Sequence, residues 1–282
     1  MIIESIPEKQ LQTGTKLFNE LIYLEKIYQT GILIEYEKVN TNNQFFDCLD
    51  KLYKDLELDR KIPLLHIEAH GGPNVLKLSS DNEIYWTELT EPFTKINIAT
   101  HNNFVVVVSA CFGAHVMSTI RIGELGRSPI FAAIGPLEEV KSQEIELGYQ
   151  AFYHELLKTE NINTDIAIDK LNERNLDNTK KFILISSQRL FYHGCSTSIR
   201  EWNSIKAIGH RAQRINKLIK SEPMTKDMPE EIKNFILIDA VNQEPMPVIE
   251  KLYNQFMMID LFPENSLRFH FDKTKITQNN QL

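Results

Sequence analysis

The segments LLHIEAHGG, residues 64–72, and FVVVVSACFG, residues 104–113, decide the fold. Each is an apolar run that ends in small residues and one reactive side chain, His70 or Cys111. Continuous apolar runs of this length are typical of strands buried on both faces of a parallel sheet. The four valines at 105–108 strengthen the prediction because β-branched side chains favour strands.

Further strands and helices alternate around these two segments. Apolar residues at helical spacing predict helices, and short β-rich runs predict strands. We expect helices over 8–28, 45–56, 87–100, 113–126, 141–158 and 165–173, a hairpin over 74–86, and further strands over 31–39, 128–136 and 181–191. This alternation predicts an α/β fold with a mainly parallel sheet and helices on both faces.

The pattern changes near residue 198. A basic amphipathic helix over 200–220 leads into segments that contain proline and methionine. We therefore predict two domains: the α/β domain over 1–198, and a mostly helical C-terminal extension over 199–282 with a regulatory or partner-binding role. The basic helix could bind nucleic acid or an acidic protein, but a solvated helix face is the simpler interpretation.

Charge and composition exclude several classes of protein. The formal net charge is −7, so the chain lacks the overall basic field of a nucleic-acid-binding protein, and we predict no direct nucleic-acid binding. Three widely spaced cysteines argue against a disulfide framework and suit a reducing cytoplasm. The N-terminal residues lack a signal-peptide pattern, and no apolar run is long enough to span a membrane. We expect a cytoplasmic protein.

His70 and Cys111 suggest nucleophilic catalysis. Functional groups in open parallel sheets gather at the carboxyl ends of strands, and neighbouring strands lie about 4.8 Å apart. A histidine beside a thiol helps to form the thiolate and then protonates the leaving amine. The start of a helix after Cys111 would favour the same negative charge. We expect the backbone amides of Gly71 and Cys111 to hold an oxyanion.

Other histidines and cysteines have simpler interpretations. His66 lies four residues before His70, about 13 Å along a strand, so the two cannot share a metal ion. We expect His66 to be a core residue bonded to backbone. Cys111 and His115 have the spacing of half a zinc site, but no second pair completes it. We predict neither a metal nor a cofactor.

Three more residues stay outside the predicted dyad. Cys48, in a helix, is expected to be a small buried hydrophobic residue. Cys195, in the sequence His193-Gly194-Cys195, is expected in a loop beside the substrate cleft. Glu68 could polarise His70, but a Cys-His dyad does not require a third member.

The motifs LHIEAHGG (65–72) and VVVVSACFG (105–113) resemble those of caspase-like cysteine peptidases, and are closest to the bacterial CHAT branch. Ser109 stands where animal caspases have glutamine. The resemblance covers residues 31–190. It implies a caspase-like sheet, with His70 as base, Cys111 as nucleophile and the Gly71 amide in the oxyanion hole.

The sequence therefore predicts a cysteine endopeptidase. The substrate pocket is expected around Ser109 and in the segment after 181–191, with Arg189 as a candidate for an acidic P1 residue, and Glu138 or Asp177 for a basic one. By resemblance we expect a regulated bacterial protease, with a protein substrate and a regulatory partner in trans, and a role in antiviral defence. The alternatives are a catalytically inactive adaptor and a thiol hydrolase or acyltransferase that acts on small molecules.

Overall fold

The computed structural model describes residues 1–59, 62–120, 126–158, 164–177, 179–200, 202–221, 228–242 and 244–277. The chain forms two compact units: Met1–Arg121 with Arg127–Ser187, and Ile122–Gly126 with Gln188–Leu282. The predicted domain boundary at 198 falls inside the helix Ser187–Arg200. The assignment of two separate domains stays a prediction.

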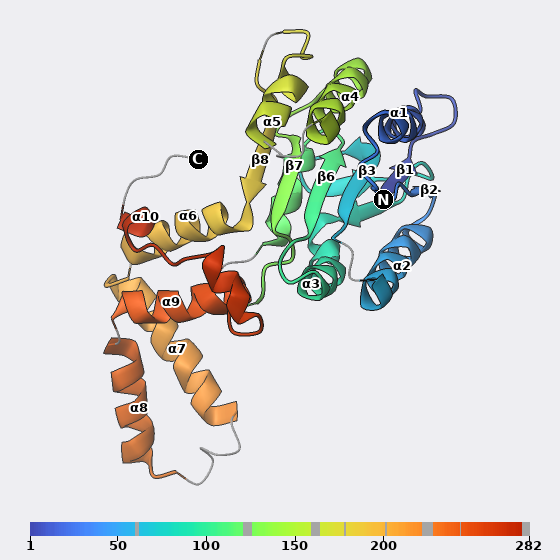
Figure 1. The fold of residues 1–282 in the computed structure, drawn as a ribbon. Coiled ribbons are helices and arrows are strands. Elements are labelled where there is room, and N and C mark those ends of the chain that lie inside the picture. The colour runs from blue at the N-terminus through green and yellow to red at the C-terminus, as the bar shows by residue number, and fades with distance from the viewer. Residues whose placement is uncertain are drawn as a thin grey trace. The chain divides into compact units, whose positions relative to one another are not determined.

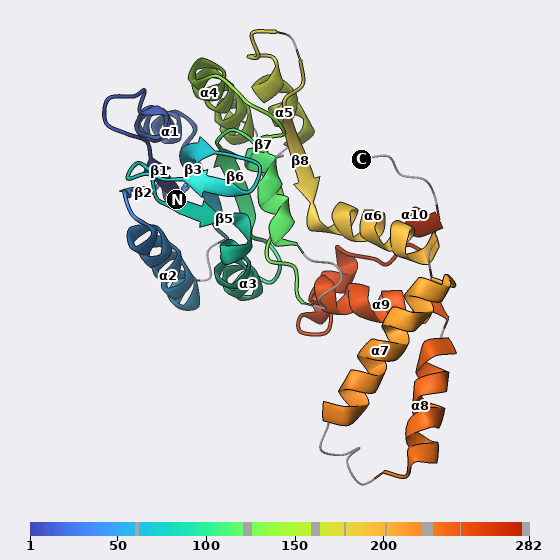
Figure 2. The same ribbon diagram turned by 180° about the vertical axis from the view of Figure 1, so that it is seen from behind.

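A mostly parallel sheet forms the centre of the first unit (Figure 1). Its strand order is β2-β1-β3-β6-β7-β8, and only β8 runs antiparallel to its neighbour along this path. The bounds are β1 Ile2–Ser5, β2 Tyr36–Lys38, β3 Leu64–Gly71, β6 Val105–Ser109, β7 Ala132–Pro136 and β8 Phe182–Ser186. The predicted hairpin, β4 (Val75–Lys77) and β5 (Glu83–Tyr85), pairs with the end of β3; β5 is labelled in Figure 2.

Helices cover both faces of this sheet. One face carries α1 (Thr13–Tyr28), α4 (Ser142–Lys158) and α5 (Thr164–Asn172), and the other carries α2 (Asn42–Asp59) and α3 (Thr90–Ala99), as Figure 1 shows. A short 3-10 turn, η1 (Trp86–Leu89), precedes α3. Apolar side chains from α1, α4, α5 and the central strands form one buried cluster. The predicted caspase-like α/β fold is confirmed.

The second unit is helical, also as predicted. Its elements are α6 (Ser187–Arg200), α7 (Ile205–Ser221), α8 (Glu230–Asn242), α9 (Pro245–Phe256), η4 (Pro263–Leu267) and α10 (Thr274–Thr277). The rings of Phe191 and Tyr192 in α6 contact Tyr253 in α9. Among the described residues, no helix is both long and apolar enough to cross a membrane.

Some local predictions are wrong. Residues 187–191 begin α6 instead of extending β8, and His193 to Cys195 lie in that helix and not in a loop. The cause is a helical spacing that starts inside the apolar run: Phe191, Tyr192, Cys195 and Ser196 are buried at intervals of four residues. The element after Cys111 is a short 3-10 helix, η2 (Gly113–Thr119), and 121–125 lie outside the described residues.

Candidate active site

The carboxyl ends of β3 and β6 bring His70 and Cys111 to the same edge of the sheet. The two strands pair in parallel, and the register ends with Glu68 opposite Ser109. His70 and Cys111 each lie two residues beyond that pair. The contact is close, because a Cβ atom built on Gly71 would lie only 2.2 Å from the carbonyl oxygen of Cys111. The predicted neighbouring strands therefore do meet at the reactive residues.

A tight turn presents Cys111. The amide of Gly113 donates to the carbonyl oxygen of Ala110 at 2.9 Å, which closes a four-residue turn. Phe112 occupies the left-handed region with φ 58°, as the third residue of a type II turn does. Gly113 cannot carry a side chain, since a Cβ atom would lie 2.3 Å from the oxygen of Val108. The Ala-Cys-x-Gly motif thus encodes the turn.

The two reactive side chains have different partners. Cys111 is half-buried, and its Sγ atom donates to the carbonyl oxygen of Val140 at 3.7 Å. His70 is exposed, and its Nε2 atom lies 2.7 Å from Oε1 of Gln10. An amide oxygen can only accept, so this contact puts the imidazole proton on Nε2 and leaves Nδ1 as the basic nitrogen. Thiol and imidazole do not bond to each other in the structure as described.

A buried polar chain lies beneath His70 on the same strand. Both ring nitrogens of His66 are bonded, Nδ1 to the hydroxyl of Tyr153 and Nε2 to Glu68, each at 2.9 Å. Thr13 donates to the other oxygen of Glu68 at 2.7 Å. His66 is therefore in the core as predicted, but its side chain bonds to side chains instead of backbone. Glu68 binds His66 and Thr13, and it makes no described bond to His70.

Glu4 is a second buried carboxylate that sequence patterns did not identify. Its Oε1 atom accepts from the amide of Gly14 at 2.7 Å, and its Oε2 atom accepts from the hydroxyls of Thr15 and Tyr36 at 2.7 and 2.6 Å. Burial, together with the hydrogen bond to Glu4, raises the pKa of Tyr36 to about 12. Glu4 thereby caps α1 from a neighbouring strand, and so fixes the loop that carries Gln10.

The predicted pocket residues separate into two groups. Ser109 is buried directly before the Cys111 turn, and its hydroxyl has no hydrogen-bond partner among the described residues. Glu138 has an exposed side chain, and its carbonyl oxygen accepts from the amide of Phe112 at 3.1 Å. Arg189 lies in α6 of the second unit, which follows the antiparallel strand β8. Asp177 pairs with Lys181.

The other two cysteines are more buried than Cys111. Burial raises the pKa of the Cys48 thiol, with a smaller contribution from Glu37, and burial raises that of Cys195 to about 12. The Nδ1 atom of His115 donates a hydrogen bond to the carbonyl oxygen of Pro73 at 3.0 Å, because a carbonyl oxygen can only accept. The described residues bring together no group of three His, Cys, Asp or Glu side chains suited to a metal ion.

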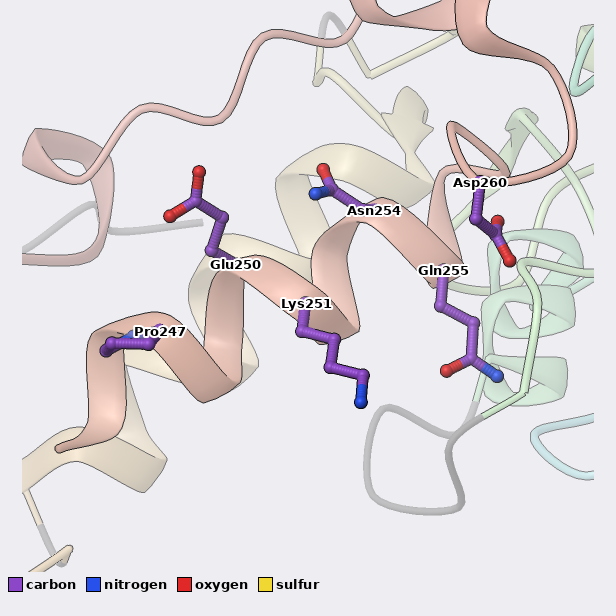
Figure 3. A pocket seen from close by; sticks show the side chains of 6 residues that line it. All are labelled: Pro247, Glu250, Lys251, Asn254, Gln255 and Asp260. Atoms are coloured by element: carbon purple, nitrogen blue, oxygen red, sulfur yellow. The ribbon is translucent and has the colours of Figure 1, made fainter. Parts of the chain in front are cut away.

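A surface pocket in the second unit offers none of these groups (Figure 3). The pocket lies along α9 and the turn after this helix. Its lining consists of Pro247, Glu250, Lys251, Asn254, Gln255 and Asp260. None of these side chains is a thiol or an imidazole. The predicted dyad lies in the first unit instead, at the ends of β3 and β6.

The region around the dyad also matches a known family. Residues 6–124 match the model of the Peptidase C13 family. That range contains Gln10, His70 and Cys111 in one continuous stretch, and it supports a place for the chain in the caspase-like cysteine peptidase superfamily. The match does not single out the CHAT branch. A search of the curated proteins returned no match.

Proposed function

We propose that the protein is a cysteine endopeptidase with Cys111 as nucleophile and His70 as general base. The observation that carries the proposal is the contact between the ends of β3 and β6, where Gly71 approaches Cys111 too closely for any side chain. This contact lies within the part of the chain that matches a peptidase family. Cys111 is also the least buried of the three cysteines.

The reaction follows from the groups at this edge. Nδ1 of His70 accepts the proton of Cys111, and the sulfur attacks the carbonyl carbon of the scissile peptide. The amides of Gly71 and Cys111 donate to the oxyanion. When the C–N bond breaks, the imidazolium returns its proton to the leaving amine. Water then hydrolyses the thioester, with His70 again accepting a proton, and the free thiol is restored.

Activity requires the thiol to leave its resting partner. Cys111 bonds to the carbonyl oxygen of Val140, and this oxygen would repel a thiolate. Rotation of the side chain toward His70 removes the repulsion. Hydrogen bonds of this kind often tighten only when the substrate is bound.

The substrate is a protein, and the pocket candidates are Ser109 and Glu138. The backbone of Glu138 contacts the turn of Cys111, so its exposed carboxylate is the candidate that would favour a basic P1 residue over an acidic one. Arg189, the candidate for acidic selection, belongs to α6 of the second unit. By the resemblance to CHAT peptidases, we place the protein in the bacterial cytoplasm as a regulated antiviral protease, with residues 199–282 or a partner in trans as regulator.

The test is the identification of new protein amino termini in cells that express the wild type or the Cys111→Ala variant beside their genomic neighbours. Cleavage by the wild type alone supports the proposal, and equal cleavage by the variant contradicts it. Cleavage by neither, with both proteins folded, favours the inactive adaptor. Labelling of Cys111 by small acyl donors, but not by a peptide-like thiol trap, favours the small-molecule hydrolase.

A further inference from the structure

Lys181 and Glu144 form an ion pair near the loop 137–141. Neither side chain takes a direct part in the proposed reaction. Nζ of Lys181 lies 3.2 and 3.4 Å from the two carboxylate oxygens of Glu144, and 2.9 Å from Oδ2 of Asp177. The side chains of Lys181 and Glu144 are 9% and 1% exposed. Removing two charges from water is unfavourable, so a buried pair adds little stability over a pair of apolar residues, although removing one partner alone is destabilising. A different role would explain this pair better.

The backbone of Lys181 and the carboxylate of Glu144 hold the two ends of the loop 137–141, which joins β7 to α4. At the first end, the amide of Leu137 donates to the carbonyl oxygen of Lys181 at 3.0 Å. At the other end, the amide of Lys141 donates to Oε2 of Glu144 at 2.9 Å. Side chains 137–139 are exposed, and Val140 is the apolar side chain of this loop that packs against the core. The ion pair adds to this packing, because Lys181 holds the carboxylate that accepts from the amide of Lys141.

Between those anchors, the loop contacts the Cys111 turn twice. The carbonyl oxygen of Glu138 accepts from the amide of Phe112 at 3.1 Å. The carbonyl oxygen of Val140 accepts from Sγ of Cys111 at 3.7 Å. A continuous set of contacts therefore runs from Lys181 and Glu144, through the backbone of 137–141, to the thiol.

We propose that Lys181 and Glu144 are positioning residues for Cys111, which act by fixing the loop 137–141 against the turn that carries the thiol. The proposal rests on the proposed function for its effect on peptide cleavage. Loss of the pair frees the loop, so the thiol becomes more accessible to small reagents. The same loss misplaces the nucleophile, and misplacement by about 1 Å can lower the catalytic rate about 100-fold.

The test compares Lys181→Met with Lys180→Met. The two variants remove the same charge one residue apart, but Lys180 pairs with Asp169 on the surface. We measure alkylation of Cys111 by iodoacetamide, resolved from Cys48 and Cys195 by peptide mass spectrometry, together with kcat and KM for a cleaved peptide. All measurements are made below the melting temperature of each variant.

We expect Lys181→Met to alkylate about fivefold faster at Cys111 and to lose at least tenfold in kcat with little change in KM. Lys180→Met should match the wild type in both, and Lys181→Arg should restore most of the activity. A purely structural role would lower the melting temperature without changing the alkylation rate of the folded protein. Wild-type alkylation and kcat in Lys181→Met would overturn the proposal.

A second variant and a measurement that needs no substrate keep the test decisive. If Lys181→Met does not fold, Glu144→Gln removes the charge from the other partner at nearly constant volume, and it should show the same faster alkylation. If no peptide is cleaved even by the wild type, the proposed function fails. The alkylation rates still test the positioning role, because they require no substrate.

Discussion

The Nε2 atom of His70 lies 2.7 Å from the Oε1 atom of Gln10. Gln10 belongs to the loop between β1 and α1, and its backbone amide donates to the carbonyl oxygen of Pro7 at 2.9 Å. The side-chain amide of Gln12 ties the same loop by donating to the carbonyl oxygens of Pro7 and Gln10 at 2.8 and 3.1 Å. A rigid loop therefore sets the orientation and the tautomer of the imidazole.

Replacing Gln10 should weaken catalysis without weakening substrate binding. Gln10→Ala leaves the imidazole free to rotate, so we expect kcat to fall about tenfold while KM stays within twofold. Gln10→Glu keeps a hydrogen-bond acceptor, and it should move the acid limb of the pH–rate profile to higher pH, because a carboxylate favours the imidazolium form of His70. Steady-state kinetics check both, with the exposed Lys9→Ala as control. Equal kcat in Gln10→Ala and the wild type would contradict this role.

The two glycines after His70 should respond very differently to alanine. A Cβ atom at Gly71 would lie 2.2 Å from the oxygen of Cys111, whereas one at Gly72 would meet nothing closer than Val75 Cγ2 at 3.7 Å. Gly71→Ala must push the ends of β3 and β6 apart, so we expect loss of cleavage and a lower melting temperature. Gly72→Ala should behave as the wild type in both. Full activity of Gly71→Ala would be inconsistent with the close approach.

The free energy of unfolding should depend on the hydroxyl of Tyr153, which bonds to His66 in the buried polar chain. Tyr153→Phe leaves Nδ1 of His66 buried without a partner, and such a loss lowers the free energy of unfolding by about 1–3 kcal/mol. Tyr28→Phe is the matched control, because its hydroxyl bonds to His154 at an exposed position. We expect Tyr28→Phe to lower the free energy of unfolding by less than about 0.5 kcal/mol. Urea unfolding measures both, and equal effects would refute the difference.

The stabilising effect of Lys181 should disappear in acid. Burial raises the pKa of Glu144, but the amides of Lys141 and Leu176 and the charge of Lys181 outweigh it, so the net pKa is lowered. Hydrogen bonds from Thr179 and Lys181 lower that of Asp177. Carboxylates with lowered pKa values stabilise the fold above their unfolded values, near pH 4, and lose this effect as the pH falls through the folded values.

The hydrogen bond to Asp177 raises the pKa of Lys181, so its contribution persists up to about pH 10 and is lost only as the pH rises through the folded value. We expect Lys181→Met to melt roughly 5 °C below the wild type at pH 7. The gap should shrink at pH 3. Circular dichroism at both values checks this, and Lys180→Met should show no gap at either pH. A gap of the same size at pH 3 would rule out the ion pair as its cause.

The sequence predicts the centre of this fold well because burial leaves a clear pattern there. β3 and β6 are buried on both faces, and their apolar runs stop where His70 and Cys111 begin. The strand β1 has only four residues, too few for a period to show, although it pairs with both β2 and β3. The direction of β8 leaves no trace in its apolar pattern, so the sequence did not predict that this strand runs antiparallel to β7.

The supporting residues could not be predicted because their partners lie far away in the chain. Glu4 and Glu144 are ordinary acidic residues in the sequence, and only the folded chain shows that each accepts backbone amides in a buried position. Gln10 has no motif of its own and lies 60 residues before its partner His70. Such contacts depend on the three-dimensional arrangement of the elements and not on a local period.

The anchoring of the loop 137–141 also has a consequence for how the protein is made. The last residue that this loop needs, Lys181, is synthesised long after Cys111, and the loop cannot be fixed before Lys181 and the loop come together. On a ribosome the nascent chain thus carries its thiol for some 70 residues of elongation with an unfinished site. Under the proposed mechanism, the order of synthesis therefore delays the appearance of a competent nucleophile until Lys181 has joined the sheet.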